Sequence, residues 1–444
     1  MTKQWHLILP IVCGLTLTAC GGGGGSSPTP VDNTGPIVDN VPPTWGHQLR
    51  LLPGLTVTEI MTPFTEYDSS YKLELVQPID HNDPSKGTFL QTAYLHHNDG
   101  ALPIVMKIAA GPAGNVPTAI STLIGGNQIS ISHRYFNTAM PETIDWEYLS
   151  AEQQAADLHA FYELLKPIYP NQWVGTGYSG GGEAALQYNY HYPDDLDATV
   201  VYATGLMNSH ADTRLEEYVY NTVSTSECRD RISDFQRLVL SNKTEILSAL
   251  QLDSELFDMP LGKVLEYGVV EFPYMFWMND EHDCATIRVE GSEISAIAAY
   301  LDKYIWFNGN NRENLLYSAA FYVDIYNEAG YFGFKTDHLA DLMNYPNITS
   351  MDFTPEEGKR TYDPSKMQDM TDWLTNQGEH IIYVYGGVDP YTQAGIMPID
   401  ALESFAAINP DASHEVNISG HPDKDQIHAA LASWLGVQVP VNVK

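Results

Sequence analysis

One stretch of this sequence, WVGTGYSGGGEAAL at residues 173–186, limits the fold more than any other. Its middle, Gly177-Tyr178-Ser179-Gly180-Gly181, fits the pattern Gly-x-Ser-x-Gly between an apolar run and an alanine-rich run. In this pattern a strand turns sharply into a helix and lifts the serine clear of the backbone, and the crowded turn needs glycines. Any glycine-rich turn can hold a serine, so the neighbouring segments must decide whether Ser179 is a nucleophile.

Strand-like and helical patterns alternate on both sides of this turn. Strands are expected at 103–109 and 128–132, and a helix is expected to begin at Ser150, where Gln153 completes a capping-box pattern. The turn is followed by a helix to Tyr190 and an apolar strand at 198–203. Alternation of this kind implies a parallel sheet. Two earlier segments, 72–76 and 87–94, have the pattern of antiparallel strands.

The alternation stops near residue 206 and resumes near 371. The intervening segment is mostly helical in pattern, and strands at 380–385 and 415–418 and a helix at 425–435 follow it. A sheet interrupted late by a helical block is typical of an α/β-hydrolase with a lid. We therefore predict the α/β class, with an α/β-hydrolase core at 46–205 and 371–444 and a large, mainly helical lid at 206–370.

Asp389 is the expected catalytic acid. In this fold the acid and the histidine follow the serine along the chain, on loops after later strands. Asp389 follows the apolar strand at 380–385 through the turn Gly386-Gly387-Val388, and Pro390 stops the strand from continuing. An Asp-Pro turn that merely caps a strand is the structural alternative.

Three histidines at intervals of seven, His414, His421 and His428, are candidates for the base. With a strand at 415–418, His414 would open that strand, His428 would lie inside the last helix, and His421 would follow the strand's end. His421 is therefore the expected base, on the sheet edge where Ser179 and Asp389 emerge. Strand, loop and helix would point the three rings apart, so no metal site is expected.

These residues define an acyl-transfer mechanism without a cofactor. His421 would remove the Ser179 proton, Asp389 would hold the ring's tautomer, and the alkoxide would form an acyl-enzyme. The backbone N–H of Gly180 would stabilise the oxyanion, and the loop 110–115, with Gly111, would supply a second donor.

The first 45 residues have the pattern of an export signal and a tether. Residues 1–20 have a cationic start, an apolar run and Leu17-Thr18-Ala19-Cys20, which resembles a bacterial lipobox. That resemblance implies cleavage before Cys20, lipidation of this cysteine, and attachment to the cell envelope, with the outer membrane favoured; an ordinary secretory signal is the alternative. The Gly/Ser/Pro-rich residues 21–45 are expected to be a flexible linker.

Only two cysteines, Cys228 and Cys284, remain beyond the signal and the lipobox. In an oxidising compartment they are expected to form a disulfide. In the chain-entropy model, a disulfide between residues this far apart stabilises the folded protein by about 4 kcal/mol.

The formal net charge is −34, from 22 Lys+Arg against 56 Asp+Glu. Such a charge argues against a nucleic-acid partner. It would attract cationic ligands, such as peptides with a free amino terminus, although solubility alone also explains it.

Several stretches resemble, in order, the streptomycete secreted tripeptidyl aminopeptidase family. These stretches are FLQTAYLHHN, SHRYF with LSAEQQAADLHAFYELLKPIY, WVGTGYSGGG, YHYPDDLDATVVYATG, LEYGVVEFPYMFW and IIYVYGGVDPYT. The resemblance implies α/β-hydrolase serine peptidases that remove tripeptides from free amino termini, with Ser179 as nucleophile and Asp389 as acid. Glu271, within VVEFPYMFW, is a candidate for binding the substrate ammonium, and packing inside the lid is its alternative role.

Two positions depart from this family. The family usually has lysine directly after the serine and glutamate before His-Arg, whereas this chain has Gly180 and Ser132. These departures bear on peptide specificity more than on the triad. A carboxylesterase or lipase with the same triad, and a non-catalytic binding protein on a hydrolase scaffold, are the rival functions; peptide length, side-chain preference and oligomeric state stay open.

Overall fold

The computed structural model describes residues 45–62, 64–136, 139–254, 257, 259–307 and 319–437. The expected signal segment 1–20 with Cys20, and the expected linker up to residue 44, lie outside these residues. None of the helices in the described part of the chain is long and apolar enough to cross a bilayer.

A nine-stranded mixed sheet forms the centre of the described chain, in the order β1-β2-β3-β5-β4-β6-β7-β8-β9. The first three strands pair antiparallel, β3 pairs antiparallel with β5, and all later neighbours are parallel. The strands are β1 (Leu55–Ile60), β2 (Ser69–Pro78), β3 (Thr88–His97), β4 (Ile104–Ile108), β5 (Asn127–Ile131), β6 (Trp173–Tyr178), β7 (Ala198–Tyr202), β8 (Ile381–Gly386) and β9 (Phe405–Asn409).

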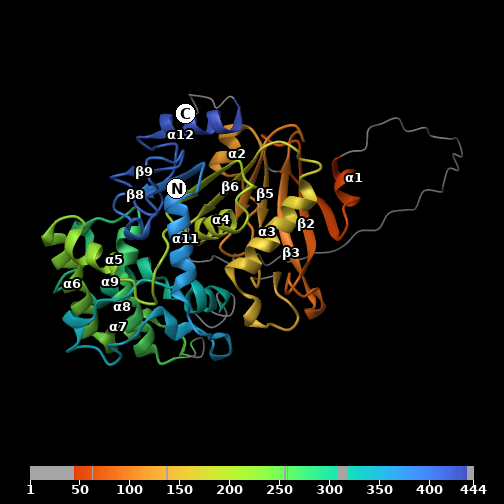
Figure 1. Cartoon of the computed structure of the whole chain (residues 1–444). Coiled ribbons are helices and arrows are strands. Elements are labelled where there is room, and N and C mark those ends of the chain that lie inside the picture. The colour runs from red at the N-terminus through yellow and green to blue at the C-terminus, as the bar shows by residue number, and fades with distance from the viewer. Residues whose placement is uncertain are drawn as a thin grey trace, which may run out of the picture.

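Helices cover both faces of this sheet (Figure 1). One apolar cluster joins one sheet face to α3 (Ala151–Leu165), α4 (Gly180–His191) and α11 (Pro364–Asn376), and α1 (Trp45–Arg50) also contributes to it. A second cluster joins the other face to α2 (Ala119–Ile124) and α12 (Lys424–Leu435). This three-layer arrangement of helices around a mostly parallel sheet is the expected α/β-hydrolase fold.

Local signals set the ends of two helices. The Ser150 hydroxyl accepts a hydrogen bond from the Gln153 N–H at 3.3 Å and caps α3, as expected. The Gln153 amide does not complete the box, because it bonds instead to the Asp80 carboxylate and the His81 N–H. Gly436 ends α12 in the left-handed conformation, with φ +63°.

A mainly helical segment lies between β7 and β8, and we call residues 206–363 the lid. Its helices are α5 (Thr213–Glu217), α6 (Ser226–Ser241), α7 (Lys243–Leu250), α8 (Leu261–Met278) and α9 (Ile294–Ile305). They form an apolar core of their own beside the sheet (Figure 1). The boundary expected at 370 falls inside α11, whose Met367, Met370 and Leu374 pack in the core of the sheet.

The strand expected at 415–418 is wrong, since those residues are a loop, and the last strand is β9. β9 is the edge strand, and only Ala407 of its five residues is buried, so it lacks the apolar run that marks a buried strand. Val416 and Ile418 are apolar for a different reason: they pack against α12 as part of a loop. The last strand therefore ends at Asn409, nine residues before the expected end at Ile418.

Candidate active site

Ser179 occupies the turn between β6 and α4 in a conformation that L-residues rarely adopt. Its backbone has φ +53° and ψ −125°. The Ser179 N–H donates to the Tyr202 carbonyl at 2.9 Å, and the Ser179 carbonyl accepts from the N–H groups of Gly182 and Glu183 at 2.8 and 3.1 Å. The strand and the helix therefore hold the serine in the strained geometry that the motif predicted.

The glycines of the turn have no room for a side chain. A Cβ on Gly177 would lie 1.9 Å from the Gly181 carbonyl oxygen, and a Cβ on Gly181 would lie 2.5 Å from the Ile108 carbonyl oxygen. These contacts are with backbone atoms of β4 and α4, which cannot rotate away. The Gly-x-Ser-x-Gly spacing is thus a steric requirement of this turn.

Asp389 is fully buried after β8, and its carboxylate holds His414. The distance between Asp389 Oδ2 and His414 Nδ1 is 2.7 Å, and Asp389 Oδ1 accepts from the Tyr391 N–H at 3.1 Å. A carboxylate at Nδ1 keeps the proton on that nitrogen and leaves Nε2 as the basic atom. His414 Nε2 is buried and has no hydrogen-bond partner in the described chain.

The His414 ring lies beside the nucleophile turn. Its centroid is 5.6 Å from that of Tyr178, the residue before Ser179, in an edge-to-face arrangement. Ser179, Asp389 and His414 thus follow the carboxyl ends of β6, β8 and β9, three strands of the parallel part of the sheet. This is the arrangement that a serine hydrolase needs for nucleophile, base and acid.

The expected pairing of Asp389 with His421 is wrong. The His421 Nδ1 accepts instead from the Asp423 N–H at 3.0 Å, and burial lowers the pKa of this ring. His428 lies on α12, where it lines a cavity that does not include Asp389. The physical reason is the misplaced strand: β9 ends at Asn409, so the loop that returns to Asp389 carries His414.

Backbone contacts fix the His414 loop against the acid loop. The N–H groups of Gly387 and Val388 donate to the carbonyls of Asn409 and Ala412 at 2.7 and 3.0 Å. A Cβ on Gly386 would lie 2.0 Å from the Ser413 carbonyl oxygen. The Gly386-Gly387 pair in the sequence was therefore a signal for a close approach of another loop.

The loop 110–115 lies next to the turn, as its expected role in an oxyanion hole requires. A Cβ on Gly180 would lie 3.2 Å from Ala110 Cβ, and a Cβ on Gly181 would lie 3.3 Å from the Ala110 nitrogen. The Gly111 carbonyl accepts from the His133 N–H at 2.8 Å, and the Ser132 hydroxyl accepts from the Ala113 N–H at 2.9 Å. Ser132, one of the two departures from the family pattern, thus anchors this loop.

Glu271 lies in α8 as a buried carboxylate without a cationic partner in the described chain. Its Oε1 accepts from the Tyr267 hydroxyl at 2.9 Å, and burial raises its pKa to about 7. Its charge also acts on Tyr391, whose pKa is raised mainly by burial. The Tyr391 ring lies 5.2 Å from the His414 ring.

Two further carboxyl groups lie near the nucleophile and were not foreseen. Glu183 lies in the first turn of α4, four residues after Ser179, and the charge of Asp324 in the lid acts on it. Burial and the charge of Asp324 raise the pKa of Glu183 well above its usual range, and burial raises that of Asp324 to about 7. Both side chains remain partly exposed. Two carboxyl groups with raised pKa values are therefore associated with the start of the helix that follows Ser179.

The expected disulfide is present. Cys228 in α6 and Cys284 after α8 are bonded, with their Cα atoms 5.5 Å apart. It links two parts of the lid.

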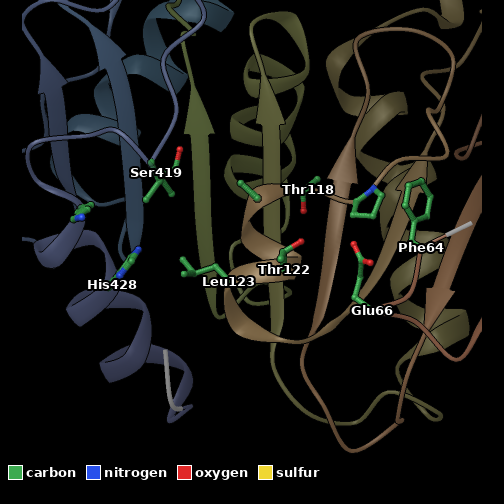
Figure 2. Close-up of a pocket in the computed structure, with 11 residues that line it drawn as sticks. Phe64, Glu66, Thr118, Thr122, Leu123, Ser419 and His428 are labelled. Carbon is green, nitrogen blue, oxygen red and sulfur yellow. The ribbon is translucent and has the colours of Figure 1, made fainter. Parts of the chain in front are cut away.

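A cavity of about 430 Å³ lies between α2 and α12. Figure 2 shows Leu123 and His428 on one side of it and Phe64 and Glu66 on the other. Neither Ser179 nor His414 lines it. This cavity is therefore separate from the catalytic residues.

Comparisons with known proteins show that the chain is similar to serine peptidases. The model of the PS-10 peptidase S37 family matches residues 45–444. A prolyl tri/tetrapeptidyl aminopeptidase of Streptomyces mobaraensis is 27% identical over 380 residues, which are 81% of this chain and 79% of the relative.

Solved structures with a similar fold include two bacterial enzymes of low sequence identity. A proline iminopeptidase of Mycobacterium smegmatis is 10% identical with a TM-score of 0.38, over 82% of this chain and 97% of its own. An α/β fold family hydrolase of Bacillus anthracis is 11% identical with a TM-score of 0.35, over 86% and 99%.

Proposed function

Since the chain belongs to the PS-10 peptidase S37 family, we propose that its serine peptidase activity releases short peptides, above all tripeptides, from free amino termini. The observation that carries this proposal is the Asp389–His414 pair, whose unpartnered Nε2 belongs to a ring 5.6 Å from the ring of Tyr178, the residue before the strained Ser179. The relative named as a tri/tetrapeptidyl aminopeptidase supports the choice of substrate.

The proposed triad is Ser179, His414 and Asp389. His414 Nε2 takes the proton from Ser179 Oγ as that oxygen attacks the scissile carbonyl, and Asp389 stabilises the imidazolium that forms. The Gly180 N–H and an amide of the loop 110–115, either Ala110 or Gly111, stabilise the oxyanion. The imidazolium then protonates the leaving amine, and water, activated by the same ring, releases the short peptide from the acyl-enzyme.

Glu271 is the proposed partner of the substrate ammonium. A buried carboxylate that lacks a cation in the described chain is destabilised in its charged form, and an arriving ammonium relieves that cost. The net charge of −34 adds a long-range attraction for the same group.

A comparison of free and blocked substrates tests this function. A tripeptide amide with a free amino terminus is expected to have a kcat/KM at least about tenfold higher than its N-acetylated form. Glu271→Gln is expected to remove most of that preference, whereas the matched change Glu245→Gln, at an exposed lid position, should leave it intact. Equal rates on free and blocked peptides, with faster cleavage of simple esters, would instead identify a carboxylesterase with the same triad.

We also propose that the protein is anchored to the bacterial cell envelope through a lipidated Cys20. The support is the lipobox-like Leu17-Thr18-Ala19-Cys20 with the glycine-rich stretch behind it. In a phase-separation assay the native protein should enter the detergent phase and Cys20→Ser should stay in the aqueous phase. Recovery of both proteins from the aqueous phase would contradict the anchor.

A further inference from the structure

Two lid side chains form hydrogen bonds with the two loops that carry the acid and the histidine. The Ser413 hydroxyl, next to His414, donates to the carboxylate of Asp280. The Tyr218 hydroxyl donates to the carbonyl of Gly387, two residues before Asp389, at 2.6 Å. Both contacts join segments more than 130 residues apart in the sequence.

The Asp280 contact reaches the backbone on both sides of His414. Asp280 follows the end of α8, and Ser413 is 1% exposed. The Ser413 hydroxyl also accepts from the Glu415 N–H at 3.2 Å. One buried hydroxyl therefore ties the residue before His414, the residue after it, and a carboxylate of the lid into a single chain of hydrogen bonds.

The Tyr218 contact is equally close to the acid. Burial raises the pKa of the Tyr218 hydroxyl, and the charge of Asp389 raises it further, so this group keeps its proton and acts as a donor. Gly387 also donates its N–H to the Asn409 carbonyl at 2.7 Å, which fixes the acid loop from the side of β9. The lid thus holds one face of a loop whose other face is held by the sheet.

We propose that Asp280 and Tyr218 are positioning residues through which the seated lid aligns Asp389 and His414 for proton transfer from Ser179. This inference rests on the proposed triad. Neither residue touches the reacting atoms; each acts through one loop. A shift of about 1 Å in a catalytic base can cost about a hundredfold in rate, so one hydrogen bond per loop is enough to matter. The rate of the chemical step would then depend on how the lid packs against these two loops.

A double-mutant cycle tests the Asp280 contact. Asp280→Ala and Ser413→Ala are each expected to lower kcat by about ten- to a hundredfold while KM changes less than about threefold. The double variant should be no slower than the worse single variant, because both changes remove the same hydrogen bond. Asp280→Asn keeps an oxygen acceptor for the Ser413 hydroxyl and should recover kcat to within about threefold of the native enzyme.

Tyr218→Phe should likewise lower kcat and leave KM near the native value, since it removes only the hydroxyl. Asp341→Ala is the matched control, because Asp341 pairs with Arg237 on the exposed side of the lid. This control should leave kcat unchanged, and melting temperatures of all variants would show whether any loss comes from unfolding. Native kcat in Asp280→Ala, fully additive losses in the double variant, or no recovery in Asp280→Asn would each overturn the proposal.

The rate at which a fluorophosphonate labels Ser179 separates this inference from the proposed substrate. Labelling depends on the base and its alignment, and it needs no peptide recognition. If no peptide is cleaved but Asp280→Ala slows labelling at least about tenfold, the substrate proposal fails and the positioning role stands. If peptides are cleaved and labelling is equally fast in both proteins, the positioning role fails alone.

Discussion

At the scale of single residues, the partner of one ring nitrogen decides which histidine can act as a base. Asp389 binds His414 Nδ1, and a backbone N–H binds His421 Nδ1. A base needs an orienting carboxylate on one nitrogen and a free second nitrogen next to the nucleophile. Only His414, among the three C-terminal histidines, has the Asp389 contact.

Alanine substitutions of the two histidines should therefore differ strongly. His414→Ala is expected to lower kcat by at least about a thousandfold, because Ser179 loses its base. His421→Ala should lower kcat by less than about tenfold and act mainly on stability. Steady-state kinetics with a peptide amide, together with a melting curve for each variant, would check this. A fully active His414→Ala enzyme would refute the assignment.

The Glu271 carboxyl group is expected to lower the free energy of unfolding as pH rises. Its pKa is about 7 in the folded protein, because of burial, against 4.5 for the ordinary side chain. Between these values the unfolded chain releases a proton that the folded chain keeps, so the free energy of unfolding falls as pH rises through this range. The full loss, about 3 kcal/mol at most, is present above pH 7.

Glu271→Gln removes this titration and keeps an acceptor for the Tyr267 hydroxyl. The variant should therefore melt at a higher temperature than the native protein at pH 8 and at a similar temperature at pH 4.5. Melting curves at the two pH values measure the difference. An equal shift at both pH values would mean that the pKa of Glu271 does not differ between the folded and unfolded states.

At the scale of elements, the junction of β6 and α4 has the least room for change. A Cβ on Gly177 would meet the backbone of Gly181 and Gly182 at 1.9 to 2.6 Å, so Gly177→Ala must push the helix from the strand. We expect this variant to lose at least about 2 kcal/mol of stability and most of its activity.

Gly262→Ala provides the control for that substitution. Gly262 lies in the first turn of α8, and a Cβ there would meet no heavy atom within 4 Å. Because alanine is the better helix former, this variant should be as stable as the native protein or up to about 1 kcal/mol more stable. Denaturant unfolding compares the two variants. If Gly177→Ala keeps the native stability and activity, the backbone of the turn can move enough to accept a Cβ.

At the scale of the whole molecule, the lid has its own apolar core and its own covalent link. The Cys228–Cys284 disulfide joins two residues 56 positions apart within this segment. Replacing both cysteines by serine should lower the melting temperature. The chain-entropy model gives about 4 kcal/mol as the upper limit for the loss in free energy of unfolding. If the lid aligns the triad, the variant's fluorophosphonate labelling should also slow before the sheet unfolds on heating. Unchanged melting would show that the lid is held by packing alone.

The sequence by itself determined the α/β-hydrolase fold, the strained turn that holds Ser179, the loop after β8 that holds Asp389, and the disulfide. These features depend on short-range chemistry: glycines in a crowded turn, apolar runs in central strands, and two cysteines free to pair. The tertiary structure alone decided that His414 rather than His421 meets Asp389, and that Asp280 and Tyr218 reach the catalytic loops. β9 is an edge strand with only one buried residue, so the sequence has no apolar run there that would mark where the last strand ends. The contacts of Asp280 and Tyr218 join segments more than 130 residues apart, and they depend on how the lid packs on the sheet.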